Sequence, residues 1–289
     1  MTPPAQNNHD HGIDALLPQE IAEKAEAVGI QKTRRDATTL FVLGVLAGAF
    51  IALGAMFATT VLAGANGAIP FGVSRLLAGI VFSLGLILVV IGGAELFTGN
   101  TLMVMALAAG RVRLAEMLRA WAIVYAGNFV GAVGTALLVF LAGHYLGGGG
   151  SIAAVALKIG AQKAALPFDQ ALLLGILCNV LVCLGVWLSL GARSTTDKIL
   201  AVLFPVSAFV GAGFEHSVAN MYFIPLALLI KAFAPAALWT SLATTPGAFP
   251  GLTIGGLVTN LVPVTIGNII GGGVLVGAVY WFVYLRTRE

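Results

Sequence analysis

Six long apolar segments, separated by short polar stretches, form the main pattern along this chain. Their approximate bounds are 38–64, 71–109, 115–143, 169–191, 198–230 and 252–285. A helix needs about 20 consecutive apolar residues to cross the hydrocarbon core of a bilayer, and each segment reaches that length. We therefore expect an all-α integral membrane protein with six transmembrane segments.

The second and fifth segments are longer than one crossing requires, and each contains glycines near its middle. Gly93 and Gly99 lie in the second segment, and Gly211 and Gly213 lie in the fifth. Glycine is a poor helix former and permits sharp changes of backbone direction. We therefore predict that transmembrane helices 2 and 5 are interrupted at mid-membrane.

The two halves of the chain resemble each other. Residues 127–131 (Gly-Asn-Phe-Val-Gly) in the third segment match residues 267–271 (Gly-Asn-Ile-Ile-Gly) in the sixth. Three spans per half give the second half the opposite orientation, so we expect two inverted three-helix repeats at about 37–143 and 168–286. Interrupted helices at matching places in inverted halves are typical of a substrate path near the membrane midplane.

The charges predict the topology. Placing the N-terminus in the cytoplasm puts eleven of the fifteen Lys and Arg residues on that side, in agreement with the positive-inside rule. We expect a cytoplasmic segment 1–36 with an amphipathic helix beginning near Pro18, a single transmembrane channel domain at 37–286, and a cytoplasmic tail at 287–289. The membrane lipid is thus an expected partner.

Composition excludes several other classes of protein. The chain is 59% hydrophobic and 9% charged, with a mean hydropathy of +0.99, whereas soluble domains carry about 25% charged residues. A net charge of +3 without a basic-aromatic patch gives no reason to expect nucleic acid. Of the four histidines, His9, His11, His144 and His216, only His216 lies in a span. We therefore expect no metal, no cofactor and no enzymatic activity.

The strongest chemical signal is Glu215 followed by His216 inside an apolar run. An ionisable residue at the bilayer centre costs about 2.5–3.5 kcal/mol, so such a pair must be sheltered by protein or by a water-filled path. A half-helix that begins at mid-membrane carries a partial positive charge at its N-terminus, which favours an anion. Glu95 stands beside the corresponding break in the second segment.

Three motifs resemble those of the formate/nitrite transporter family. They are residues 94–98 (Ala-Glu-Leu-Phe-Thr), 213–221 (Gly-Phe-Glu-His-Ser-Val-Ala-Asn-Met) and 263–268 (Pro-Val-Thr-Ile-Gly-Asn). The resemblance runs from about Leu16 to Arg286 and is greatest to the formate channels. One departure concerns the first break, where enteric formate channels tend to have Asp and then Ser, whereas this chain has Glu95 and Gly99-Asn100. Selectivity between formate and nitrite therefore stays open.

The resemblance implies an aquaporin-like fold, a homopentamer with one pore in each protomer, and a set of pore residues. It makes His216 the pore histidine and Thr98 the threonine opposite. It also places Leu86 and Phe209 as apolar constrictions on either side of the histidine, with Phe82 beside Leu86. The full expected set comprises the substrate pathway (His216, Thr98, Asn268, Asn179), the constrictions (Leu86, Phe209, Phe82, Leu96, Phe97) and the structural residues of the breaks (Glu95, Glu215, Gly93, Gly99, Gly211, Gly213, Asn128).

The residue types suggest how these roles divide. A carboxylate beside a helix break can accept freed backbone N–H groups, whereas in a pore it would repel anions, so Glu95 and Glu215 are expected to be structural. Asn268 is the stronger candidate for a pore ligand, Asn179 for a packing hydrogen bond, and Asn128 for a structural repeat mate of Asn268.

We expect a bacterial inner-membrane channel for small monovalent anions, with formate first and nitrite second. In this hypothesis His216 hydrogen-bonds or protonates the passing anion. The alternative is a proton-coupled formate or nitrite symporter on the same scaffold. A water or glycerol channel is disfavoured because neither break has an Asn-Pro-Ala sequence. The direction of net flux, a regulatory partner, and a gating role for segment 1–36 remain open.

Overall fold

The computed structural model describes residues 14–65 and 69–287, and within them all regular structure is helical. His9 and His11 of the N-terminal segment, together with Arg288 and Glu289 of the tail, lie outside the described residues. In chain order the elements are α1 (Pro18–Thr33), α2 (Ala37–Leu62), α3 (Phe71–Gly92), α4 (Phe97–Asn100), η1 (Thr101–Met103), α5 (Val104–Ala108), α6 (Leu114–Leu141), η2 (His144–Leu146), η3 (Gly148–Gly150), α7 (Ser151–Ala164), α8 (Phe168–Gly191), α9 (Thr195–Ala212), α10 (Ser217–Phe233), α11 (Ala236–Ser241), η4 (Pro246–Ala248), α12 (Ile254–Ile269), η5 (Ile270–Ala278) and α13 (Val279–Tyr284).

Six helices of the described chain are long and apolar enough to cross a membrane. They are α2, α3, α6, α8, α9 and the continuous run of α12, η5 and α13, Ile254–Tyr284. The prediction of six apolar membrane-length segments is thereby confirmed. The two overlong segments each divide in two: α3 is followed by the shorter helical run Phe97–Ala108, and α9 is followed by α10.

The two halves pack their helices in the same order. In the first half α2 packs against α3 and α6, and in the second half α8 packs against α9 and α12; α3 and α9 join the halves. Glycines bring the helices close. In the α2–α6 pair a Cβ added at Gly127 would overlap backbone of the facing helix, and one at Gly44 would make a very tight contact with it; in the α8–α12 pair a Cβ at Gly175 or Gly267 would overlap backbone. Close contact through small residues is the usual way membrane helices associate.

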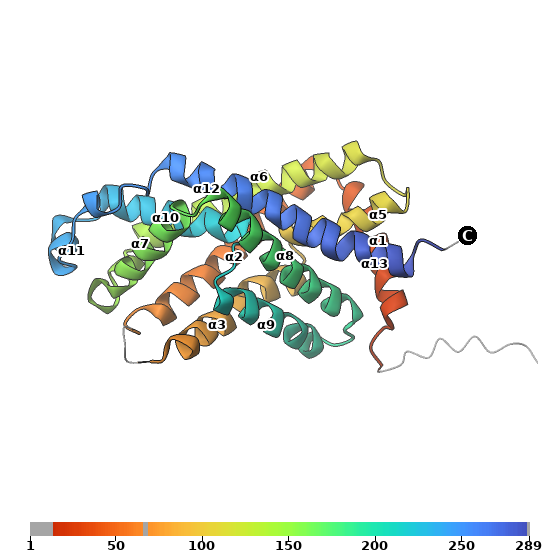
Figure 1. Ribbon diagram of the computed structural model, residues 1–289, viewed down its shortest axis with the longest axis horizontal. Helices are drawn as coiled ribbons and strands as arrows, with labels where there is room; N and C mark the ends of the chain where they lie inside the picture. The colour runs from red at the N-terminus through yellow and green to blue at the C-terminus, as the bar shows by residue number, and fades with distance from the viewer. Residues whose placement is uncertain (1–13, 66–68, 288–289) are drawn as a thin grey trace, which may run out of the picture.

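Helices outside the bundle of long spans, together with the last turns of the sixth span, lie at the two ends of the molecule (Figure 1). Helices α7 and α11 lie at one end of the long axis, and α1 and α13 lie at the other (Figure 1). Helix α1 starts at Pro18, as the sequence predicts, and extends to Thr33. Its Ile21 and Ala25 pack with Met105, Trp187 and Leu285, so α1 lies against the ends of the bundle helices and does not stand free.

Candidate substrate path

Each of the two long apolar segments is interrupted by four residues of non-helical chain. Residues 93–96 separate α3 from α4, and residues 213–216 separate α9 from α10. Both interruptions begin with a glycine in the left-handed region, Gly93 at φ 79° and Gly213 at φ 78°. A side chain at either position would strain this backbone, which explains why glycine stands there.

A buried asparagine caps the start of each following helix. The Phe97 N–H donates to Asn128 Oδ1 at 2.9 Å, and the Ser217 N–H donates to Asn268 Oδ1 at the same distance. The amide nitrogen of Asn128 donates to the carbonyls of Gly44 and Glu95, and that of Asn268 donates to those of Gly175 and Glu215. Each asparagine therefore fastens one interruption to two neighbouring helices.

These bonds show which groups the Asn268 side chain contacts, whereas its part on the substrate path stays a prediction. The sequence predicts Asn268 as a ligand on the substrate path, yet its side chain is fully buried and its amide oxygen and nitrogen are both taken by backbone groups. It has the same three contacts as Asn128, which the sequence predicts to be structural. The structure therefore gives both asparagines the work of holding the interruptions.

Glu95 joins the first interruption to the N-terminal helix. Its carboxylate accepts from Asn100 Nδ2 at 2.8 Å and from Lys32 Nζ at 2.9 Å, and it pairs with Arg35. Lys32 also donates to Asn100 Oδ1 at 2.7 Å. Because the Glu95 side chain is only 2% exposed, these two cations supply the compensation that a buried charge requires.

Glu215 is compensated in the same manner at the second interruption. It accepts from Asn220 Nδ2 at 2.6 Å and pairs with Lys163 of α7 at 2.7 Å. The backbone groups of the two glutamates also make equivalent bonds. The Glu95 N–H donates to Leu43 O, and the Glu215 N–H donates to Leu174 O. The two carboxylates thus hold equivalent parts of the two halves.

Thr98 and His216 meet between the interruptions. Thr98 Oγ1 lies 3.0 Å from His216 Nε2, and both side chains are buried. His216 Nδ1 accepts the N–H of Ala219 at 3.1 Å, so a neutral ring carries its hydrogen on Nε2. That hydrogen can be donated to Thr98 Oγ1, which leaves the threonine hydroxyl hydrogen available to another acceptor.

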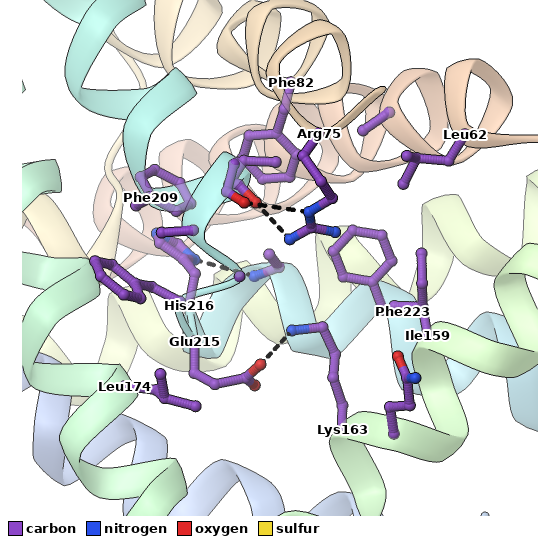
Figure 2. A pocket seen from close by; sticks show the side chains of 18 of the residues that line it. Leu62, Arg75, Phe82, Ile159, Lys163, Leu174, Phe209, Glu215, His216 and Phe223 are labelled. Atoms are coloured by element: carbon purple, nitrogen blue, oxygen red, sulfur yellow. Dashed lines mark hydrogen bonds and ion pairs between the residues drawn. The ribbon is translucent and has the colours of Figure 1, made fainter. Parts of the chain in front are cut away.

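A cavity of about 850 Å³ leads from one end of the molecule to His216. Figure 2 shows Arg75 and Lys163 entering it from different elements, with Phe209 beside His216. The Phe209 ring stacks on the imidazole at a centroid distance of 5.9 Å, and the edge-on Phe82 ring lies 5.7 Å from Phe209. The inner end of the cavity is therefore apolar except for the histidine.

The other predicted constriction residues are buried but do not line this cavity as the described residues define it. Leu86 and Leu96 are each 2% exposed within the main core. Phe97 packs edge-on against Trp121 and Tyr125, with centroid distances of 5.9 and 4.9 Å, so its ring is directed toward α6. The part of Phe97 as a constriction residue stays a prediction, and the structure shows its ring in this aromatic cluster.

Asn179 holds the chain around Thr98. Its amide nitrogen lies 3.1 Å from Thr98 O, 3.1 Å from Thr101 Oγ1 and 2.6 Å from Asn268 O. The Asn268 carbonyl precedes the π-helical turns of η5, whose wider hydrogen-bonding pattern changes the partners of nearby carbonyls. These contacts agree with the packing role considered for Asn179 in the sequence.

Gly99 and Gly211 complete the predicted set and differ from the two left-handed glycines. Gly99 lies inside α4, where a Cβ would make ordinary contact with Val186. Gly211 lies in the last turn of α9, and its carbonyl accepts from Arg75 Nε at 3.2 Å.

Several residues of this region were given no role in the sequence-based predictions. They are the two asparagines five residues after each glutamate, Asn100 and Asn220, and the cations Lys32, Arg35, Lys163 and Arg75. The equal Glu-to-Asn spacing was a usable signal. The cations gave none, because they lie far along the chain from their partners. No cluster of three or more His, Cys, Asp or Glu side chains suited to a metal occurs in the part of the chain that the structure describes.

The six membrane-length helices and the buried polar pair at the end of a cavity define a membrane transport protein. A family model described as formate/nitrite transporter matches residues 19–282. The chain belongs to the formate/nitrite transporter family.

Named relatives agree with this assignment. The formate channel FocA of Escherichia coli (strain K12) is 44% identical over 281 residues, which cover 97% of this chain and 98% of the relative. The formate channel FocA of Haemophilus influenzae is 38% identical over 274 residues, covering 94% and 96%. A solved structure, a pentameric formate channel with formate bound, is similar with a TM-score of 0.82 at 43% identity, covering 86% of this chain and 98% of that chain.

Proposed function

We propose that this protein is a bacterial inner-membrane channel for small monovalent anions, with formate as the first substrate and nitrite as the second. The names of its relatives support formate. The contact between Thr98 and His216, at the inner end of a cavity of about 850 Å³, carries the proposal. Nitrite is included because it has the same charge and a similar size and bent shape.

The proposed path passes between two inverted repeats whose interruptions lie at mid-membrane. Two pairs of residues support this arrangement, because the members of each pair make equivalent contacts in the two halves. Asn128 matches Asn268, and Glu95 matches Glu215. Freed backbone groups must be satisfied within the protein at that depth, and the two asparagine caps do so. The caps occupy the first amide of each half-helix, so the solute meets the field of the helix ends and the side chains of Thr98 and His216.

His216 is the proposed central group. An anion that reaches it accepts a hydrogen bond from the ring or from the Thr98 hydroxyl, and the Phe82 and Phe209 rings keep bulk water away. A proton that enters from the outer solution and binds Nδ1, with loss of the bond from the Ala219 N–H, converts the ring to an imidazolium ion. In this dry environment the negative charge of the anion stabilises that ion, which can then transfer its Nε2 proton to the anion and return to a neutral ring. The ion pairs of Glu95 and Glu215 keep the carboxylates from repelling the anion.

We also propose a homopentamer with one pore per protomer, by analogy with the solved pentameric formate channel. Exposed apolar side chains such as Leu138, Leu141 and Phe204 on the outer faces of the spans would then contact lipid or neighbouring protomers. Both termini are proposed to be cytoplasmic, which places α1 inside and the cavity at the outer face.

The selectivity is tested by uptake of labelled formate into proteoliposomes in competition with nitrite, lactate and hydrosulfide over a pH series. We expect formate to be taken up and nitrite to compete, and lactate to compete less because it is larger. Absence of formate uptake by assembled protein would contradict the proposal.

A proton-coupled symporter is the second candidate, favoured by the titratable ring on the path. Transport current separates the two mechanisms. Passage of the bare anion carries charge across the membrane, whereas passage of formate together with one proton does not. A formate flux without current would favour the symporter.

A further inference from the structure

Arg75 supplies the net charge of the outer cavity. The charged side chains that line it are Arg75, Lys163 and Glu215. Lys163 and Glu215 form an ion pair with an Nζ–Oε1 distance of 2.7 Å, so their charges compensate each other. Arg75 has no carboxylate within ion-pair distance among the described residues. The cavity that leads to His216 is therefore positive because of this one residue.

The guanidinium of Arg75 is held in a fixed position by the end of α9. Nε donates to Gly211 O at 3.2 Å and Nη2 donates to Val210 O at 2.6 Å. These carbonyls belong to the C-terminal turn of α9, where the helix dipole places a partial negative charge. Without Arg75 this negative end would face any anion entering the cavity. Arg75 therefore removes a repulsion in addition to providing an attraction.

The two carbonyls occupy only one edge of the guanidinium. A guanidinium has five N–H donors in a planar fork, and the bonds to Gly211 and Val210 use the Nε–Nη2 edge. The second hydrogen of Nη2 and one hydrogen of Nη1 form another edge, and no described side chain or carbonyl bonds to Nη1. Figure 2 shows this group directed into the pocket, across from Lys163. Two parallel N–H groups match the two oxygens of a carboxylate.

We infer that the free edge of Arg75 forms an outer subsite for a small monovalent carboxylate or related oxyanion, occupied before the anion reaches His216. This inference rests on the proposed function, since it concerns the mouth of the same path. Arg75 would then set the apparent affinity for anions that enter through the cavity. The charge provides attraction, and the fixed fork provides preference for a planar two-oxygen anion.

The test measures initial rates of labelled formate uptake against formate concentration in proteoliposomes at low and high ionic strength. Arg75→Gln removes the charge, Arg75→Lys keeps the charge without the fork, and Lys158→Gln removes an equivalent charge from the exposed face of α7, which the cavity does not include. One unit charge at contact distance in water corresponds to about fivefold in binding.

We expect Arg75→Gln to raise KM about fivefold at low salt with a maximal rate within about twofold of wild type, and the difference to shrink at high salt. The KM of Arg75→Lys should lie between those of wild type and Arg75→Gln, and the KM of Lys158→Gln should equal that of wild type. The subsite is contradicted if Arg75→Gln leaves KM unchanged, or if it lowers only the melting temperature and maximal rate, as a helix-capping role would. An equal effect of Lys158→Gln would also contradict it, because a diffuse surface charge would then account for the affinity.

The wild-type protein separates this inference from the proposed function. If wild type takes up no formate, the proposed substrate is wrong, and the same variants are then compared with nitrite. If wild type transports formate and the KM of Arg75→Gln equals that of wild type, the subsite alone is wrong.

Discussion

At the scale of single residues, polar side chains in this protein act in matched pairs. Asn128 and Asn268 each satisfy one helix N-terminus and two carbonyls, and Glu95 and Glu215 each accept from the asparagine five residues later. An unsatisfied polar group buried in such a place costs free energy, so each bond is part of the fold. The two residues that meet between the interruptions break this symmetry, because His216 matches the apolar Leu96 and Thr98 matches the apolar Val218.

Alanine at either asparagine should therefore harm folding to a similar extent. Asn128→Ala and Asn268→Ala each remove three hydrogen bonds and leave a buried N–H without an acceptor, which we expect to cost about 3 kcal/mol in free energy of unfolding. Thermal unfolding of the detergent-solubilised protein measures the effect. If Asn268→Ala instead kept wild-type stability and lost transport, Asn268 would be a substrate ligand, as the sequence alone suggests.

Thr98 offers a second test at this scale. Thr98→Ser keeps the hydroxyl that meets His216, and Thr98→Val keeps the volume without it. We expect Thr98→Val to lower the maximal rate of formate uptake at least tenfold, and Thr98→Ser to retain most of it. Melting temperatures of both variants serve as the control. Loss of stability in Thr98→Val with unchanged transport would make Thr98 a structural residue.

At the scale of elements, ion pairs join helix α1 to the bundle beside the first interruption. Lys32 and Arg35, at and after its C-terminal end, reach the buried carboxylate of Glu95 beside the first interruption. Lys24 Nζ adds a bond of 2.7 Å to Leu190 O at the end of α8. Burial lowers the pKa of Lys24 below its ordinary value, and the nearby charges of Lys198 and Arg193 lower it further.

Removing both cations should destabilise the protein through Glu95. The double variant Lys32→Met with Arg35→Met leaves a buried carboxylate unpaired, and we expect a loss of about 3 kcal/mol in free energy of unfolding. Adding Glu95→Gln to the double variant removes the unpaired charge and should restore much of the stability. Thermal unfolding of the three proteins decides this. A triple variant no more stable than the double variant would show that the carboxylate charge is not the cause.

At the scale of the whole molecule, the order of the helices can be predicted from the sequence, whereas the ion pairs between charged side chains cannot. Hydropathy gives the six membrane-length segments, and the glycine pattern marks where α3 and α9 end. The partners of Glu95 and Glu215 stay hidden, because Lys32, Arg35 and Lys163 lie 52 to 63 residues away and only the fold brings them together. The backbone contacts of Asn268 could not be predicted, because an amide beside a pore motif looks the same in sequence whether it binds solute or backbone.

The two ends of the molecule also differ in a way that hydropathy does not reveal. One end has a cavity of about 850 Å³ lined by Arg75 and Lys163, whereas α1 packs across the other. Both ends keep one net positive charge in these groups. At the α1 end Lys32 and Arg35 both contact the single carboxylate of Glu95, whereas at the cavity end Lys163 pairs with Glu215 and Arg75 has no carboxylate partner among the described residues. An anion that enters from the cavity end therefore meets a cation without an ion-pair partner, Arg75.

The central claim is that formate passes His216, and pH-dependent uptake of labelled formate by proteoliposomes tests it most directly. His216→Asn is the decisive variant, because asparagine can still accept the Ala219 N–H at this N-cap but cannot titrate. We predict that His216→Asn folds and assembles, and that its uptake loses the pH dependence of wild type. A folded His216→Asn protein with the wild-type rate and pH profile would contradict the account.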